Sequence, residues 1–338
     1  MKYFSLFSGI GGFELGIQRS LYNKSIRFEV EGKIDLPQDM SNINESGIRR
    51  PKATCVGFSE IDKYATQIYK KHFPNHKEYG DVSKIKWNDV EDFDLLCGGF
   101  PCQSFSIAGK RGGFDDTRGT LFFEIARAAQ HKQPRLLLLE NVKGLLSHNQ
   151  GETFHTILKT LDGIGYDLQW QVLNSKNFGV PQNRERVFII GHLRGTSRPQ
   201  VFPIGTYNSK NNSMANESNE IRNRTWSGSL RARGTTSYGS GDVFIKTKEV
   251  KIRRLTPTEC ERLQSFPDDW TEGISDTQRY KCLGNAVTVN VIQAIMEKLL
   301  NARGGKWTKF ILVISVVVRN GLYTMNLLNA LNVQKSIM

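Results

Sequence analysis

Residues 3–21 place an apolar segment, a glycine-rich turn and a helical pattern in direct succession. The segment YFSLFS, residues 3–8, has the length and apolar content of a buried strand. Glycines that let a ligand approach the backbone follow at Gly9, Gly11 and Gly12. Apolar residues then recur at helical spacing, at Phe13, Leu15, Ile17 and Leu21. Strand, glycine turn and helix in this order predict the first unit of a nucleotide-type α/β domain.

Later segments repeat the alternation of strand and helix. Strands are predicted at 55–62, 94–99, 135–141, 166–173 and within 180–191, and helices at 63–73, 120–130 and 151–165. Another helix should begin at Pro257 with Thr256 as its cap, and one more should follow Asn285. We therefore expect an α/β fold with a doubly wound, mostly parallel sheet.

The segment GFPCQSFS presents a cysteine directly after a predicted buried strand. Pro101 fixes its own φ angle and pushes Phe100 towards extended geometry, so Cys102 has the defined direction that a nucleophile needs. A glycine-punctuated segment follows as far as Gly119, and such a loop can close over a substrate and exclude water. Taken alone, a cysteine after a strand is more often a buried structural residue than a nucleophile.

Charged residues stand where predicted strands begin or end. Glu60 follows the second strand, where a doubly wound fold places a carboxylate that binds ribose hydroxyls, although a helix cap is the alternative. Glu140 ends a fully apolar run, where a carboxylate is costly unless it has a partner. Arg184 and Arg186, two residues apart before an apolar strand, would share a strand face and hold a phosphate or a base oxygen. Surface arginines are the alternative for this pair.

The chain carries a large positive charge. Its 338 residues include 46 lysines and arginines against 33 acids, which gives a net charge of +13 and a pI near 9.5. Such a surplus favours a polyanionic partner, nucleic acid before membrane. Residues 192–254 hold 12 of the basic residues against 4 acids in a loop-rich stretch, where contacts to nucleic acid would be placed. Arg231 and Arg233 are the candidates there.

The cysteines and the apolar segments of the sequence indicate in which cellular compartment the protein works. The five cysteines are widely spaced, no CxxC pair occurs and no histidine is placed for a zinc site. Neither a disulfide framework nor a metal site is therefore expected. Reduced thiols and the lack of a signal-peptide layout predict a cytoplasmic protein. The apolar run at 310–318 is far shorter than the ~20 residues that a membrane span needs.

Several motifs together resemble those of the DNA cytosine carbon-5 methyltransferases. They are FSLFSGIGG, GFPCQSFS, the ENV run from Glu140 and the QNRER run, in that family's order between about residue 4 and residue 300. The resemblance implies a Rossmann-like methyltransferase fold with a smaller DNA-recognition domain. It also implies methyl transfer from S-adenosyl-L-methionine to carbon 5 of a cytosine flipped out of double-stranded DNA. Cys102 would form a covalent adduct at carbon 6, with S-adenosyl-L-homocysteine as product and no metal.

The same resemblance assigns roles to individual residues. The catalytic residues would be Cys102, Glu140, Arg184 and Arg186. The cofactor-binding residues would be Phe7, Ser8, Gly9, Ile10, Gly11, Gly12, Glu60, Ile61, Asp81, Val82, Pro101, Leu121, Asn285, Ala286 and Val287. The DNA-binding residues would be Gln103, Ser104, Ser106, Arg231 and Arg233.

The resemblance also divides the chain. Residues 1–191 and 279–303 would form the catalytic and cofactor-binding domain, residues 192–278 the target-recognition domain, and residues 304–338 an extension of unknown role. An insertion at 31–52 has no assigned role. A monomer is expected, with no membrane contact and with a cognate restriction endonuclease in the same system. Two alternatives stay open: a transfer RNA cytosine-5 methyltransferase with the same chemistry, and a catalytically silent DNA-binding protein.

Overall fold

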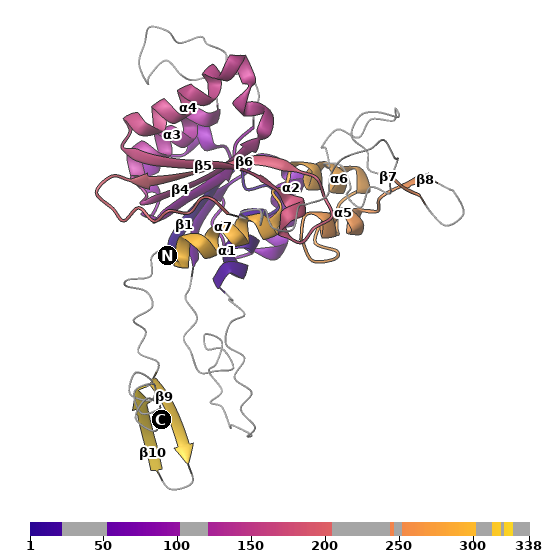
Figure 1. Cartoon of the computed structure of the whole chain (residues 1–338). Helices are drawn as coiled ribbons and strands as arrows, with labels where there is room; N and C mark the ends of the chain where they lie inside the picture. The colour runs from indigo at the N-terminus through magenta and orange to yellow at the C-terminus, as the bar shows by residue number, and fades with distance from the viewer. Residues whose placement is uncertain are drawn as a thin grey trace, which may run out of the picture.

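A computed structural model of the chain shows a six-stranded sheet with helices on both faces (Figure 1). It describes residues 1–21, 53–101, 121–204, 244–246, 252–301, 313–318 and 321–326. The insertion at 31–52 therefore lies outside the described residues. The strands of the sheet are β1 (Lys2–Leu6), β2 (Thr54–Ser59), β3 (Leu95–Gly99), β4 (Leu136–Val142), β5 (Tyr166–Asn174) and β6 (Glu185–Leu193).

The strand order is β2-β1-β3-β4-β6-β5. Strands β1 to β4 are parallel to their neighbours, whereas β6 runs antiparallel between β4 and β5. The prediction of a doubly wound, mostly parallel sheet is thus confirmed.

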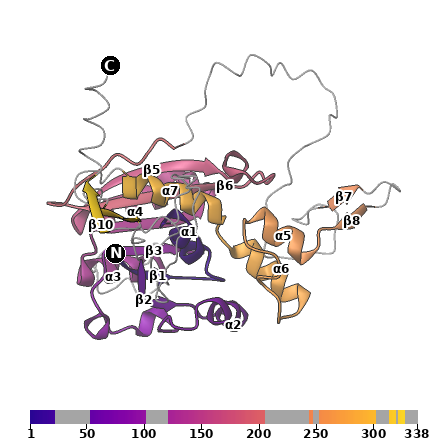
Figure 2. The same cartoon turned by 90° about the horizontal axis from the view of Figure 1, so that it is seen from below.

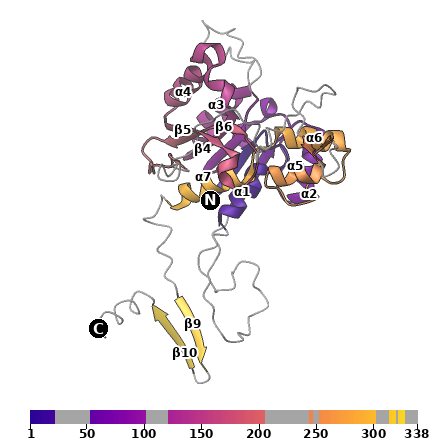
Figure 3. The same cartoon turned by 45° about the vertical axis from the view of Figure 1, so that its right-hand side comes forward.

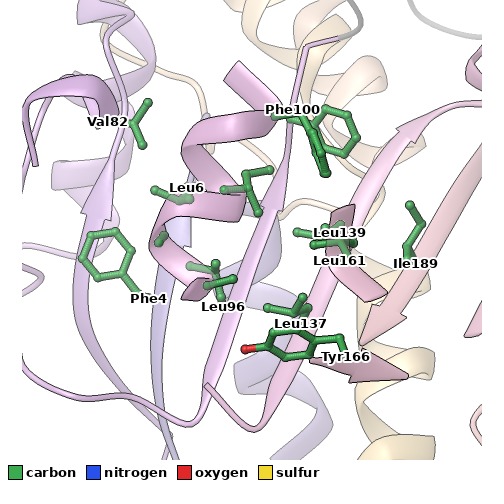
Figure 4. Packing of buried hydrophobic residues seen from close by; sticks show 14 of the residues in the cluster. Phe4, Leu6, Val82, Leu96, Phe100, Leu137, Leu139, Leu161, Tyr166 and Ile189 are labelled. Atoms are coloured by element: carbon green, nitrogen blue, oxygen red, sulfur yellow. The ribbon is translucent and has the colours of Figure 1, made fainter. Parts of the chain in front are cut away.

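Each face of the sheet has its own hydrophobic cluster, because successive residues of a strand point to opposite faces. Leu137 and Leu139 of β4 belong to the cluster under α3 (Leu121–Lys132) and α4 (Glu152–Gly163), part of which is drawn in Figure 4. Leu136 and Leu138 belong to the opposite cluster, with α1 (Gly12–Leu21) and α7 (Val289–Asn301). Figure 2 shows α1 and α7 on this second face. Burial on both faces explains why the strands read as continuous apolar runs.

A third cluster joins helices from both ends of the chain. It unites α2 (Lys63–His72), α5 (Pro257–Leu263) and α6 (Asp276–Asn285), and it includes Ile10 of the glycine loop. Figure 3 shows these three helices together beside the sheet. Residues 255–278 therefore pack against the N-terminal half of the molecule, while the predicted division into domains stays a prediction.

The sequence predicts the start of α5 but not the start of α6. Thr256 caps α5 as predicted: its Oγ1 accepts from the Glu259 amide at 3.2 Å, and Glu259 Oε2 accepts from the Thr256 amide at 2.7 Å. Helix α6 was not predicted, because only Cys282, Leu283 and Gly284 of its mostly polar sequence are buried. The helix expected after Asn285 is α7.

Short elements complete the described structure. The 3-10 helices are η1 (Val82–Lys84), η2 (Trp87–Asp89), η4 (Lys143–Leu146), η5 (His148–Gly151) and η6 (Ser175–Phe178). Two antiparallel strand pairs are β7 (Phe244–Lys246) with β8 (Ile252–Arg254) and β9 (Val313–Val318) with β10 (Gly321–Asn326). The apolar run at 310–318 thus supplies β9, which pairs outside the main sheet. Within the described ranges, no helix is long and apolar enough to cross a membrane.

Candidate active site

The carboxyl ends of β1, β2, β3 and β4 meet at one edge of the sheet, because these strands are parallel. The antiparallel β6 begins at that edge, so the residues at its start join the ends of the other strands. The register pairs Gly99 with Glu140 and Val142 with Arg186. This edge of the sheet therefore brings together the glycine loop (Phe7–Gly12), Glu60, Pro101, Glu140 and the arginine pair Arg184 and Arg186.

The glycine loop between β1 and α1 turns sharply. Gly9 and Gly11 have φ angles of 56° and 88°, a region that favours glycine. Phe7 also has a positive φ, of 53°, and this explains why β1 ends at Leu6 rather than at Ser8 as predicted. A Cβ placed on Gly9 would have no atom within 4 Å, so the loop presents open backbone at this point.

Glu60 ties the glycine loop to the end of β2. Its Oε2 accepts a hydrogen bond from the Gly9 amide at 2.8 Å. Its Oε1 accepts from the amides of Ile61 and Asp62, both also at 2.8 Å. The side chain that caps α2 is Asp62, so Glu60 is not that helix's capping residue. A carboxylate with about four acceptor positions retains capacity for a ligand hydroxyl.

A hollow of about 670 Å³ opens beside Glu60 and Asp81. Ile61 forms part of its wall and is 76% exposed. The Asp81 side chain accepts from the Ser83 amide and hydroxyl, at 3.0 and 2.8 Å, and so caps η1 at the rim. Acidic, basic and neutral polar side chains line the hollow beside Ile61, so it offers hydrogen-bond partners for the hydroxyls of a nucleoside and one apolar side chain for its ring.

The link between α6 and α7 reaches the glycine loop from the far end of the sequence. A Cβ on Gly12 would lie 2.8 Å from Val287 Cγ1 and 3.1 Å from the Val287 carbonyl oxygen, so this contact needs glycine. Ala286 and Val287 are buried, whereas Asn285 is exposed beside them. Of the three cofactor residues predicted here, Val287 thus packs directly on the glycine loop.

Glu140 and Arg186 form an ion pair at the site. Arg186 Nε lies 3.1 Å from Glu140 Oε1, and the two side chains are only 17% and 12% exposed. Burial raises the pKa of Glu140 above its usual value, while Arg186 and then Arg184 oppose that rise. A carboxyl group in this state holds a proton more readily, which suits a proton donor.

Arg184 binds backbone carbonyl oxygens, whereas Arg186 pairs with a carboxylate. It lies one residue before β6 and is 2% exposed. Its Nη2 donates to the carbonyl oxygens of Gly284 at 3.0 Å and Ala286 at 2.8 Å. Burial lowers the pKa of Arg184 to about 9, which leaves the guanidinium charged at neutral pH. Arg184 therefore holds the α6–α7 link against the start of β6.

Asn141 is a site residue that sequence reasoning did not single out. Its side-chain amide donates to the Phe100 carbonyl at 2.8 Å, and its Oδ1 accepts from the Val142 amide at 2.8 Å. Asn141 is 2% exposed. It fixes the segment that leads to Pro101. The only signal in the sequence was its position within the ENV run.

Several predicted residues lie outside the described residues. They are Cys102, Gln103, Ser104, Ser106, Arg231 and Arg233. Pro101 is described and exposed, Leu121 is 39% exposed at the start of α3, and Val82 is buried in η1.

The other four cysteines are poor candidates for a nucleophile. Burial raises the pKa of Cys55, Cys260 and Cys282 to about 12, and it also raises the pKa of Cys97 well above its usual value. Such thiols stay protonated at neutral pH. Across the described segments, no group of three or more histidine, cysteine or acidic side chains is arranged to hold a metal.

The comparisons with known proteins agree with this geometry. The family model of the C-5 cytosine-specific DNA methylases matches residues 1–225 and 203–301. The chain belongs to this family. It is an S-adenosyl-L-methionine-dependent DNA (cytosine-5) methyltransferase.

Individual relatives and solved structures are also similar to this chain over most of its length. The Type II methyltransferase M1.ScrFI of Lactococcus lactis subsp. cremoris is 36% identical, with 88% of this chain and 78% of the relative covered. M.HhaI of Haemophilus parahaemolyticus is 31% identical, with 87% and 93% covered. The structure of S. pombe Dnmt2 methyltransferase superposes with a TM-score of 0.63 at 18% identity, over 89% of this methyltransferase and 98% of that chain. A Spodoptera frugiperda DNMT2 variant gives a TM-score of 0.61 at 18% identity, over 88% and 99%. Likeness at this low identity concerns the fold alone.

Proposed function

We propose that the methyltransferase modifies cytosine within one short sequence of double-stranded DNA, with Cys102 as nucleophile and Glu140 and Arg186 as its catalytic partners. The observation that carries this proposal is the buried Glu140–Arg186 pair. It lies at the sheet edge where the segment leading to Cys102 begins, and Asn141 holds that segment through the Phe100 carbonyl. Arg184 belongs to the same site as a positioning residue.

The chemistry explains why these groups are needed. Carbon 5 of cytosine is a poor nucleophile, and addition of the Cys102 thiolate to carbon 6 turns the ring into an enamine. Glu140 supplies a proton to ring nitrogen 3 during this addition, which neutralises the charge that develops there. Arg186 orients the Glu140 carboxyl and donates to the exocyclic oxygen of the base. These ring atoms are out of reach in a duplex, so the cytosine must flip out.

The bound cofactor supplies an electrophilic methyl group to carbon 5. Loss of the carbon-5 proton, for which water is the proposed acceptor, then restores the double bond between carbons 5 and 6 and releases the Cys102 sulfur from carbon 6. The groups proposed to hold S-adenosyl-L-methionine are the glycine loop from Phe7 to Gly12, the carboxylates of Glu60 and Asp81, and the residues Ile61, Val82, Pro101, Leu121, Asn285, Ala286 and Val287. The position of Glu60, Ile61 and Asp81 in the wall of one hollow supports this assignment.

DNA recognition is assigned to parts of the chain that carry the basic surplus. We propose that Gln103, Ser104 and Ser106 contact DNA beside the flipped base, and that Arg231 and Arg233 read the target within 192–278. The enzyme would act as a monomer on DNA in the cytoplasm. Relatives bearing the name Type II methyltransferase support a role beside a cognate restriction endonuclease.

Expression in cells that lack cytosine methylation tests this proposal. We expect 5-methylcytosine at one short DNA motif for the native chain and none for Cys102→Ser, because the hydroxyl is a far weaker nucleophile than a thiolate. Whole-genome mapping of 5-methylcytosine gives activity and target together. Binding of Cys102→Ser to duplex DNA, measured by fluorescence anisotropy, should stay within about twofold of the native value. Methylation by Cys102→Ser would contradict the mechanism, and methylation confined to RNA would contradict the substrate.

A further inference from the structure

Trp270 lies between α5 and α6 and reaches the cofactor loop of the N-terminal half. Its side chain is almost fully enclosed, at 7% exposure. Its indole Nε1 donates to the carbonyl oxygen of Ile10 at 2.9 Å. Ile10 stands between Gly9 and Gly11, in the middle of the loop proposed to cradle the cofactor. This hydrogen bond joins the C-terminal part of the protein to that loop.

The Trp270 ring is held from several sides by aromatic groups. It stacks on His72 of α2 with ring centroids 3.6 Å apart and an interplanar angle of 6°. Phe266 and Phe73 pack on it at centroid distances of 5.3 and 6.0 Å. Phe73 also supports the loop, because a Cβ on Gly11 would lie 2.4 Å from its Cε2 atom. The indole therefore has a fixed orientation.

The backbone around Trp270 is fixed by a buried carboxylate. Glu261 of α5 has no exposed surface, and it accepts from the amides of Asp269 and Thr271, both at 2.8 Å. The Thr271 hydroxyl and Arg279, at 3.1 Å, complete its partners. Both residues that flank Trp270 are thus bound to one acid, so the tryptophan cannot move independently of α5.

We infer that Trp270 is a positioning residue that sets the conformation of the cofactor loop through the Ile10 carbonyl. This inference rests on the proposed role of the Phe7–Gly12 loop in binding S-adenosyl-L-methionine. Without the indole N–H, the buried Ile10 carbonyl loses its donor, and the loop gains other conformations that bind the cofactor less well. The chemical step itself uses no atom of Trp270.

Trp270→Phe tests the inference because it keeps the aromatic packing and removes the donor. We expect the Kd for S-adenosyl-L-methionine, measured by isothermal titration calorimetry on the full chain, to rise roughly tenfold. KM for the cofactor should rise in parallel, while kcat at saturating cofactor stays within about twofold. An unchanged Kd would overturn the inference.

Trp87→Phe is the matched control. Trp87 is also buried, at 2% exposure, but its Nε1 has no hydrogen-bond acceptor in the described part of the chain. Both variants lose the same atoms from a core, so both should lower the melting temperature, and only Trp270→Phe should weaken cofactor binding. An equal loss of affinity in the two variants would overturn the inference.

Two further outcomes separate this inference from the proposed function. If the native chain does not bind S-adenosyl-L-methionine, the proposed cofactor site fails and the inference fails with it. If the native chain binds and Trp270→Phe does not fold, His72→Ala removes the stacking partner at a partly exposed position. That variant should raise the Kd by a smaller factor, and an unchanged Kd would count against Trp270.

Discussion

Gly99 stands opposite Glu140 in the register of β3 and β4, and its missing side chain leaves room for the Glu140 carboxyl. A Cβ on Gly99 would lie 2.9 Å from Glu140 Oε2. The carboxyl is the flexible end of its side chain, so it would yield before the strands do. The space at Gly99 therefore helps to fix the position of the carboxyl that we propose contacts the base.

We predict that Gly99→Ala displaces the Glu140 carboxyl from Arg186 and lowers kcat by about 100-fold, because catalysis is sensitive to small misplacements. The melting temperature should change little, since the strands need not move. Steady-state methylation assays and thermal unfolding check the two halves of this prediction. Gly163→Ala, where an added Cβ meets nothing within 4 Å, is the control and should keep full activity. Normal kcat in Gly99→Ala would show that the carboxyl accommodates the methyl group.

Glu14 of α1 is a buried acid with no part in the proposed chemistry. It has no exposed surface, and Tyr69 Oη donates to its Oε1 at 3.0 Å. Burial raises its pKa from 4.5 to about 7, a rise that the hydrogen bond from Tyr69 only reduces. The folded protein therefore keeps this proton over a pH range in which the unfolded chain has lost it.

This raised pKa makes folding stability depend on pH. Because the native state binds more protons between the unfolded pKa of 4.5 and the folded pKa of about 7, the free energy of unfolding falls as pH rises through that window. We predict that Glu14→Gln removes this part of the pH dependence and is more stable than the native chain at pH 8, by on the order of 3 kcal/mol. Urea unfolding of both proteins at pH 5 and pH 8 measures the difference. Parallel pH profiles would refute the assignment to Glu14.

At the scale of elements, Arg184 fastens the end of α6 and the start of the link to α7. It donates to the carbonyl oxygens of Gly284 in α6 and Ala286 in the link, and Val287 of the link packs on Gly12 of the glycine loop. The two arginines of the QNRER run thus have different roles. Arg186 pairs with Glu140, and Arg184 joins a C-terminal connection to the start of β6.

We predict opposite outcomes for lysine at these two positions. Arg184→Lys leaves a buried carbonyl without its donor and should lower the free energy of unfolding by about 2 kcal/mol. It should also weaken cofactor binding. Arg186→Lys should reduce kcat at least tenfold with little loss of stability, because lysine cannot reproduce the Nε contact to Glu140. Urea unfolding and methylation kinetics on both variants separate the roles, and equal stability losses would argue against them.

At the scale of the whole molecule, the sequence predicts those features of the fold that depend on residues close together in the chain. The apolar runs, the glycine turn and the capping pair of α5 are properties of neighbouring residues, so the order of strands and helices could be read directly. Helix α6 was missed because few of its residues are apolar. The Arg184 and Trp270 contacts span 100 and 260 residues, and no local pattern encodes which carbonyl a distant side chain will meet.

The close contact between α1 and α7 has a consequence for how this enzyme is made. A Cβ on Gly16 would lie 2.6 Å from Ile292, so the helix after the glycine loop is completed by one of the last described helices. During synthesis, the N-terminal loop leaves the ribosome long before Val287 and α7 exist. A nascent chain that has not reached these residues lacks the packing partners of Gly12 and Gly16. We therefore expect a polypeptide that is still being synthesised to bind the cofactor and methylate DNA only after α7 has emerged.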